Sequence, residues 1–110
     1  MKLPNADRAI VEDSKLLLYL LSTTHRDGKH KAKFFRMHGY SEEFAEVLRR
    51  DLITIAQGNP VDEIIEQFDG LKYVVHGEMV PPNGSLLRIR TVWFIRAEED
   101  FPRFVTAYPQ

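Results

Sequence analysis

The sequence predicts an α+β fold, in which three N-terminal helices pack on one face of a four-stranded antiparallel meander sheet. Two observations lead to this prediction. Apolar residues recur at helical spacing up to about residue 58, whereas from Val61 onward they alternate at the period of two that is typical of strands. Turn signals, among them Asp69-Gly70 and Asn83-Gly84, then separate the apolar runs.

The three helices are expected at about 14–22, 29–38 and 42–58, after a short extended piece at 8–11. Asp13 or Ser14 can cap the first helix and Ser41 the third, because short polar side chains bind the free N–H groups of a first turn. Gly39 is the expected C-cap of the second helix, since glycine takes the left-handed conformation readily. The residues expected to face the core are Leu16, Leu17, Leu20, Leu21, Ala32, Phe34, Phe35, Phe44, Val47, Leu48, Leu52 and Ile55.

Four strands are expected at 64–68, 71–79, 86–96 and 103–108. The segment 62–66 could equally continue the third helix, so two interpretations of it stay open. Along the third strand, the alternate residues from Leu87 to Ile95 should meet the helices, and those from Leu86 to Arg96 should lie on the other face. By the same alternation, Phe104, Thr106 and Tyr108 would share one face of the fourth strand.

The sheet face away from the helices is expected to carry a basic surface with a hydroxyl edge. Its candidate members are Lys72, His76, Arg88, Arg90, Thr106 and Tyr108. Whether they converge depends on the register between strands, which alternation alone does not define. The alternative for these side chains is a solvated polar face, which a half-covered antiparallel sheet commonly has.

A basic segment covers residues 25–38, which hold five Lys or Arg, three His and a single acid, although the whole chain has a formal charge of only −1. Local positive potential of this kind favours an anionic partner, with nucleic acid the first candidate. His30 lies in the first turn of the second expected helix. Its cationic neighbours and the helix N-terminus favour the neutral imidazole that a general base requires. The alternative is an exposed histidine at the end of a loop.

Length and composition exclude several classes of protein. With 110 residues we expect a single domain, 1–110, whose helical part covers about 1–60 and whose sheet part covers about 61–110. There are no cysteines, and the histidines lack the helical spacing of a zinc site, so neither a disulfide nor a metal is expected. No nucleotide-binding glycine motif is present. No apolar run could span a bilayer and residues 1–12 lack signal-peptide character, so we expect a cytoplasmic protein without membrane contact.

Several segments resemble an uncharacterised bacterial domain family that occurs alone and at the C-termini of polymorphic toxins. They are Leu3-Pro4-Asn5-Ala6-Asp7-Arg8-Ala9, Gly28-Lys29-His30-Lys31-Ala32-Lys33-Phe34-Phe35, Tyr40, Lys72-Tyr73-Val74-Val75-x-Gly77, Arg90-Thr91-Val92-Trp93 and Pro102-Arg103-Phe104-Val105-Thr106-Ala107-Tyr108-Pro109. In its order of elements this family is similar to the barnase–EndoU–colicin–RelE (BECR) group of metal-independent ribonucleases.

The resemblance implies cleavage of RNA by attack of the ribose 2′-OH, without a cofactor. It implies His30 as base or acid, Arg90 or Arg88 as a phosphate clamp, and Thr106 with Tyr108 as contributors from the last strand. Lys29, Lys31 and Lys33 would bind or steer the substrate, together with Lys72 and His76 on the sheet. An active ribonuclease would harm its own host, so the resemblance also implies either a degenerate, inactive copy or a cognate inhibitor encoded nearby.

A non-catalytic interaction module is the alternative function. The acidic stretches 62–69 and 98–100 could pair with a basic partner, such as a neighbouring gene product. They could also pair with the basic face of a second copy, because the open face of an antiparallel sheet can bury itself against its symmetry mate in a homodimer.

Overall fold

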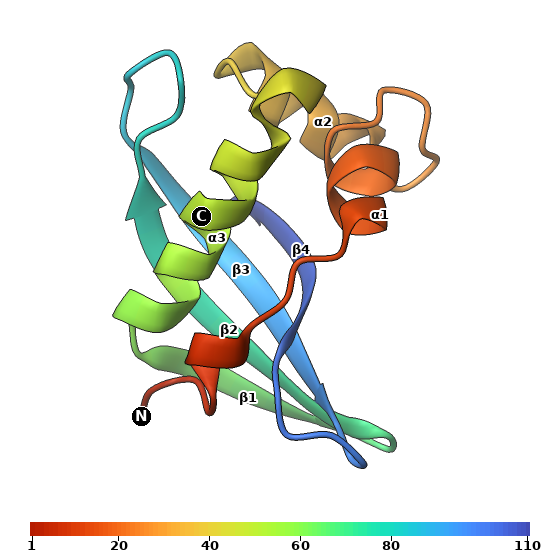
Figure 1. Cartoon of the computed structure of the whole chain (residues 1–110), viewed down its shortest axis with the longest axis vertical. Helices are drawn as coiled ribbons and strands as arrows, with labels where there is room; N and C mark the ends of the chain where they lie inside the picture. The colour runs from red at the N-terminus through yellow and green to blue at the C-terminus, as the bar shows by residue number, and fades with distance from the viewer.

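The computed structural model, which describes residues 1–110, confirms the α+β fold (Figure 1). The helical part consists of η1 (Ala6–Arg8), α1 (Asp13–Lys15), η2 (Leu16–Leu20), α2 (Lys29–Met37), η3 (Glu42–Phe44) and α3 (Ala45–Gly58). The sheet consists of β1 (Val61–Gln67), β2 (Gly70–Met79), β3 (Leu87–Arg96) and β4 (Arg103–Pro109). Its strands are antiparallel in the meander order β1-β2-β3-β4. Residues 62–66, for which two interpretations were open, therefore belong to a strand.

The helices cover one face of the sheet. Figure 1 shows α3 lying across the strands, with α1 and α2 gathered near the end at which β4 finishes. The buried side chains of β3 that point toward the helices are Leu87, Ile89, Thr91 and Trp93. Trp93 is fully buried, and its indole Nε1 donates a hydrogen bond of 2.8 Å to Thr91 Oγ1. The faces expected for β3 are thus the observed ones.

The first helix differs from the expectation. Only Asp13–Lys15 is α-helical, and Leu16–Leu20 form a π-helix in which Leu21 N donates to Leu16 O at 2.8 Å. The wider turn leaves Leu17 38% exposed, so this leucine does not face the core as the helical stripe predicted. π-Helical turns are rare and occur frequently at functional sites. The turn also carries Tyr19 toward the end of β4, where it contacts Thr106.

The second and third helices lie close to their expected ranges. Gly39 ends α2 with a φ of 99°, the left-handed conformation expected of this C-cap. The third helix opens with the 3₁₀ turn η3, and the side chain of Ser41 makes no capping hydrogen bond, contrary to expectation. Phe44 is 38% exposed rather than part of the core. The α3 residues that are buried are Ala45, Leu48, Leu52, Ile55 and Ala56.

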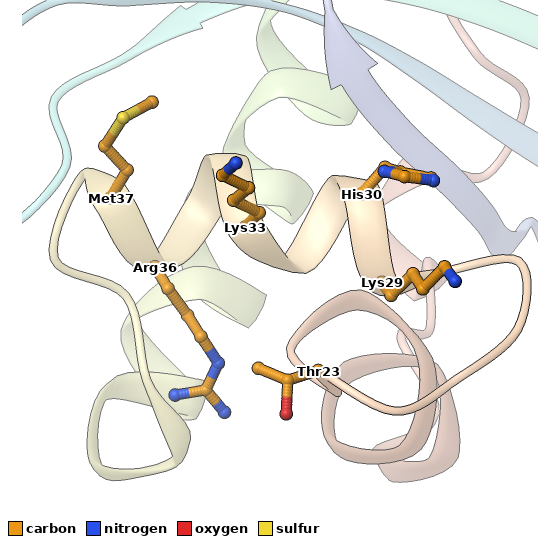
Figure 2. A pocket seen from close by; sticks show the side chains of 6 residues that line it. All are labelled: Thr23, Lys29, His30, Lys33, Arg36 and Met37. Atoms are coloured by element: carbon orange, nitrogen blue, oxygen red, sulfur yellow. The ribbon is translucent and has the colours of Figure 1, made fainter.

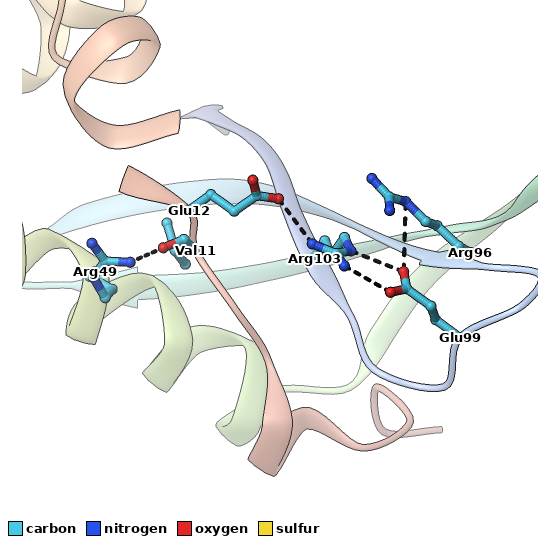
Figure 3. A network of polar contacts seen from close by, with 6 residues as sticks. All are labelled: Val11, Glu12, Arg49, Arg96, Glu99 and Arg103. Atoms are coloured by element: carbon cyan, nitrogen blue, oxygen red, sulfur yellow. Dashed lines mark hydrogen bonds and ion pairs between the residues drawn. The ribbon is translucent and has the colours of Figure 1, made fainter. Parts of the chain in front are cut away.

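The segment that precedes α1 ties β4 to α3. Ile10 pairs with β4 through a single parallel bridge to Arg103. Arg103 also binds Glu99 through two hydrogen bonds of 3.0 and 2.8 Å and Glu12 at 3.1 Å (Figure 3). Arg49 of α3 donates to the carbonyl of Val11. These contacts cover the outer edge of β4 over its first half. On the other edge of the sheet, Met1 and Lys2 pair only with Val61 and Pro60, where β1 begins.

The turns and strands contain two departures from simple alternation. The two-residue loop between β1 and β2 is Phe68-Asp69 rather than Asp69-Gly70, because Gly70 already pairs with Gln67 and Arg96. In β4 a β-bulge at Val105 places two residues opposite one of β3. Phe104 is therefore buried against Trp93 and does not share a face with Thr106 and Tyr108 as alternation predicted.

Candidate functional site

The open face of the sheet brings together a row of polar side chains from three strands. His76 of β2 lies directly opposite Arg90 of β3, and Arg90 lies directly opposite Tyr108 of β4. Thr106 lies two residues before Tyr108 and pairs with Val92. The β4 bulge keeps Thr106 and Tyr108 on this open face while the preceding Phe104 turns into the core. These four polar residues were expected to share a face, and the register places them side by side.

Lys31 joins this row from α2. Its ammonium Nζ donates to Tyr19 Oη at 2.5 Å and to Thr106 Oγ1 at 2.9 Å. The two hydroxyls are themselves 2.9 Å apart, so three polar groups from η2, α2 and β4 form a closed triangle. The same ammonium lies 5.6 Å from the centre of the Tyr108 ring. Arg90 approaches that ring as well, at 6.0 Å, and thereby links the triangle to the sheet row. We call these six residues the open-face cluster: Tyr19, Lys31, His76, Arg90, Thr106 and Tyr108.

The chemistry of Tyr19 depends on its charged neighbours. Burial raises the pKa of its phenol, but the hydrogen bonds from Lys31 and Thr106, with the charges of Lys31 and Lys15, outweigh that effect and lower the pKa below its ordinary value of 10. Gly28 is required here by a close approach, since a Cβ at this position would lie 2.3 Å from the carbonyl oxygen of Tyr19. A lowered phenol pKa makes the phenolate accessible closer to neutral pH, as a proton acceptor requires.

Two carboxylates of β1 border the other end of the cluster. The register of β1 shifts between Val61 and Glu63, so a bulge there allows the consecutive residues Asp62 and Glu63 to reach open-face partners. Glu63 Oε1 lies 3.2 Å from a guanidinium nitrogen of Arg90, and Asp62 Oδ2 lies 3.8 Å from His76 Nδ1. Buried side-chain nitrogens without a hydrogen-bond partner occur at His76 Nε2 and Arg90 Nε. Unsatisfied buried polar atoms are rare, and a catalytic role is one of the reasons for which they occur.

His30, Lys29 and Lys33 lie elsewhere. They line a hollow of about 760 Å³ on the exposed side of α2, together with Thr23, Arg36 and Met37 (Figure 2). Residues of a helix are spaced about 100° apart, so Lys29 and Lys33 point roughly 160° away from Lys31. The side chain of His30 makes no hydrogen bond or ion pair. The structure therefore does not bring His30 into the open-face cluster. The expected groove between His30 and the strand that carries Arg88 and Arg90 would have required His30 to lie there.

The remaining two candidates lie on the open face but outside the cluster. Arg88 is exposed and pairs with Glu78 at 3.3 Å. Lys72 lies four residues from His76, about 13 Å along β2, and makes no ion pair. Tyr19 was not among the site residues expected from the sequence. Its only signal was a polar tip inside the apolar run Leu16–Leu21, and the π-helix that orients it has no recognisable pattern.

No group of three or more acidic or histidine side chains is gathered in a way that could hold a metal ion. None of the helices is long and apolar enough to cross a membrane.

Fold and site together define a small α+β domain whose open sheet face gathers cations and hydroxyls from helix and sheet. The chain belongs to the family described as Domain of unknown function (DUF6883), whose model matches residues 2–110. Its fold is similar to that of a chain in the contact-dependent growth inhibition toxin–immunity protein complex from Klebsiella pneumoniae 342. The TM-score is 0.74 at 13% sequence identity, and the match covers 96% of each chain. No curated protein matches the sequence.

Proposed function

We propose that this domain is a toxin-type, metal-independent ribonuclease, or a degenerate relative of one, with its reaction centre at the open-face cluster. The observation that carries the proposal is the convergence of Lys31 with the hydroxyls of Tyr19 and Thr106, beside the ring of Tyr108 that Arg90 also approaches. No carboxylate contacts Lys31, so its charge remains available to an anionic ligand. Further support comes from the resemblance to BECR ribonucleases and from a structural neighbour that belongs to a toxin complex.

The arrangement of the cluster suits attack of a ribose 2′-OH on the adjacent phosphate. Neighbouring strands lie about 4.8 Å apart, so His76 and Tyr108 flank Arg90 from two sides across about 10 Å. Arg90 and Lys31 would hold the non-bridging oxygens, whose charge grows in the transition state. Base and acid on opposite sides of a phosphate are what in-line displacement requires.

The proton transfers follow from this placement. Tyr19, as phenolate, would take the proton of the 2′-OH while the bond from O2′ to phosphorus forms. The bond from phosphorus to O5′ breaks, and O5′ takes a proton from His76, which lies on the side of Arg90 away from Tyr108 and Lys31. The products are a 2′,3′-cyclic phosphate and a free 5′-hydroxyl. His30, which the resemblance implied as base or acid, is proposed instead to contact RNA beside the cleaved bond.

The test is incubation of the purified protein with total RNA in EDTA, beside a Lys31→Ala/Arg90→Ala variant. We expect cleavage that leaves 2′,3′-cyclic phosphate ends, reduced at least about 100-fold in the variant. His30→Ala separates the two assignments, because it should retain most of the activity if the cluster is the centre. If the wild type neither cleaves nor binds RNA at low salt, where phosphate contacts are strongest, the ribonuclease proposal is wrong.

A cognate inhibitor protein is the second part of the proposal. The structural neighbour is described as a toxin–immunity protein complex, and an active ribonuclease would require such a partner in its own cell. The inhibitor would cover the open-face cluster and present acidic groups to Lys31 and Arg90. Co-purification with the product of an adjacent gene, with loss of RNA cleavage in the complex, would support it.

One observation supports the alternative function, a non-catalytic interaction module. Phe68 is fully exposed at the tip of the β1–β2 loop, and Ile64 is 46% exposed on the same edge strand, among acidic residues. An exposed aromatic on an acidic edge suits a basic partner with an apolar pocket. If RNA is not cleaved, solution mass measured at several concentrations, with and without the product of a neighbouring gene, tests this second function.

A further inference from the structure

The exposed side of α2 carries a second cationic site, separate from the open-face cluster. The hollow of about 760 Å³ is lined by Lys29, His30, Lys33 and Arg36, with Thr23 and Met37 at its margin (Figure 2). None of its lining residues is acidic. Lys29 and Lys33 make no ion pair, so their positive charge is not neutralised within the molecule.

The side chain of Arg36 forms a rigid part of the lining of this hollow. Its Nε donates a hydrogen bond of 2.9 Å to the carbonyl of Leu21, and its Nη2 pairs with Glu42. The side chain is therefore held in one orientation, with 30% of its surface exposed. Figure 2 shows the guanidinium beside Thr23, while the other side chains project from α2 around the hollow. A preorganised cation loses less freedom on binding an anion than a mobile one does.

The two sites share a helix. Lys31 lies between Lys29 and Lys33 in sequence, and those two lysines are about 6 Å apart along the helix axis. A polyanion that places one phosphate against Lys31 can therefore continue over the N-terminal turns of α2 into the hollow. A mononucleotide or dinucleotide is too short to occupy both sides of the helix.

We propose that the α2 hollow binds phosphates of the RNA chain that flank the bond held at the open-face cluster, so that the substrate is a single-stranded RNA of several nucleotides. This inference rests on the proposed function and extends it from a reaction centre to a substrate class. An acidic protein is the competing ligand. RNA fits better because Met37 is the only apolar residue of the lining, whereas the centre of a protein interface is rich in apolar and aromatic side chains.

The first measurement is binding. A ten-nucleotide single strand with 2′-deoxyribose carries the phosphates but lacks the 2′-OH, so its dissociation constant can be measured without cleavage. We expect Lys29→Ala/Lys33→Ala to weaken binding about tenfold at low salt. It should also lower the slope of log Kd against log salt by about 1.4, or about 0.7 for each phosphate that the variant no longer neutralises. The matched control, Lys2→Ala/Arg50→Ala, removes the same charge from residues that do not line the hollow and should change neither value.

The second measurement is cleavage of a ribodinucleotide and of a ribodecanucleotide. In Lys29→Ala/Lys33→Ala, KM for the decanucleotide should rise at least about tenfold more than KM for the dinucleotide, with kcat for the decanucleotide unchanged within about twofold. Both lysines are exposed, so the melting temperature should confirm that the variant folds.

The outcomes separate the two proposals. Equal effects of the α2 variant and its control on the salt slope would overturn the inference, even if RNA is cleaved. Equal KM changes for the long and the short substrate would also overturn it. A protein that binds the decanucleotide through the α2 lysines but cleaves no RNA would instead overturn the proposed reaction and leave the phosphate site standing. A protein that binds no oligonucleotide would overturn both.

Discussion

Lys31 shows that the position of a side chain in the fold determines what it can contribute to a site. Three lysines alternate along the N-terminal half of α2, and nothing in their sequence context separates one from the others. In the structure only Lys31 turns toward the sheet, where it binds the hydroxyls of Tyr19 and Thr106. Lys29 and Lys33 point into the α2 hollow. Helical geometry could have predicted the division, but the partner of Lys31 comes from a π-helix that no local pattern indicates.

We therefore expect Lys31→Met to raise the pKa of Tyr19 back toward its ordinary value near 10. Burial would then act without the hydrogen bond and the nearest positive charge that now oppose it. If the Tyr19 phenolate is the base, the rate of RNA cleavage rises with pH through this pKa. The rise should move to higher pH in the variant, and kcat at pH 7 should fall about 100-fold. Titration of a ¹³C label in the tyrosine rings reports the pKa directly, without an activity assay.

Lys15→Met is a control for which a smaller shift of the Tyr19 pKa is expected. Lys15 lies 5.3 Å from the Tyr19 ring and contributes charge but no hydrogen bond to its phenol. Its removal should shift the Tyr19 titration in the same direction by a smaller amount. A Tyr19 titration that is identical in the wild type and in Lys31→Met would contradict the coupling between the two side chains.

At the level of elements, periodicity predicted most of the architecture. The strands, their order, the second helix and its glycine cap follow from residue spacing and turn chemistry. Three features could not be predicted: the π-helix at Leu16–Leu20, the β1 bulge and the β4 bulge. Each of these three features inserts or shifts a single residue in a helix or strand, and tertiary packing determines the position at which this occurs. All three lie beside the open-face cluster, and for this reason the site was harder to predict than the fold.

Packing between α3 and β2 depends on the absence of a side chain at Gly77. A Cβ there would lie 2.6 Å from Cγ2 of Ile55 and 2.8 Å from Nδ2 of Asn59. We expect Gly77→Ala to lower the free energy of unfolding by about 1–3 kcal/mol, as overpacking of a tight contact commonly does. Denaturant unfolding measures the change. Gly58→Ala is the control, because nothing lies within 4 Å of a Cβ at the end of α3, and that variant should lose no stability.

For the whole molecule, net charge is a poor guide to the surface. The chain is almost neutral, yet cations gather on α2 and at the open-face cluster while acids gather along β1 and the β3–β4 turn. The distribution of charged residues along the sequence predicted this division in outline. The convergence of His76, Arg90 and Tyr108 required the register of three strands, which follows from packing over the whole sheet.

Stability of the whole fold should fall in alkali because of Tyr40. Burial raises the pKa of its phenol, and the hydrogen bond it donates to Asp51 at 2.8 Å, with the charge of that carboxylate, raises it further. A phenol whose pKa is raised on folding stabilises the native state below the unfolded pKa of about 10 and loses that contribution as pH rises above it. We expect the free energy of unfolding to fall by up to about 1.4 kcal/mol for each pH unit above 10.

Tyr40→Phe lacks the titrating group and should show a shallower decline over the same range, although it begins less stable. Denaturant unfolding of both proteins between pH 8 and 11 provides the comparison. Parallel stability curves would show that other groups determine the alkaline behaviour.

The bulge at Val105 has a consequence for how the gene can change. Deletion of one codon within a strand normally reverses every following side chain, so a core residue becomes a surface residue and the fold is lost. Here Phe104 already faces the core and Thr106 already faces outward, on either side of an unpaired residue. Removal of Val105 would leave both faces as they are and convert β4 to regular pairing. We expect a protein lacking Val105 to fold, as its circular dichroism and melting curve would show, with a straighter β4 and a displaced Thr106. Loss of this single codon during evolution would then yield a folded relative in which Thr106 no longer completes the open-face cluster with Tyr19 and Lys31.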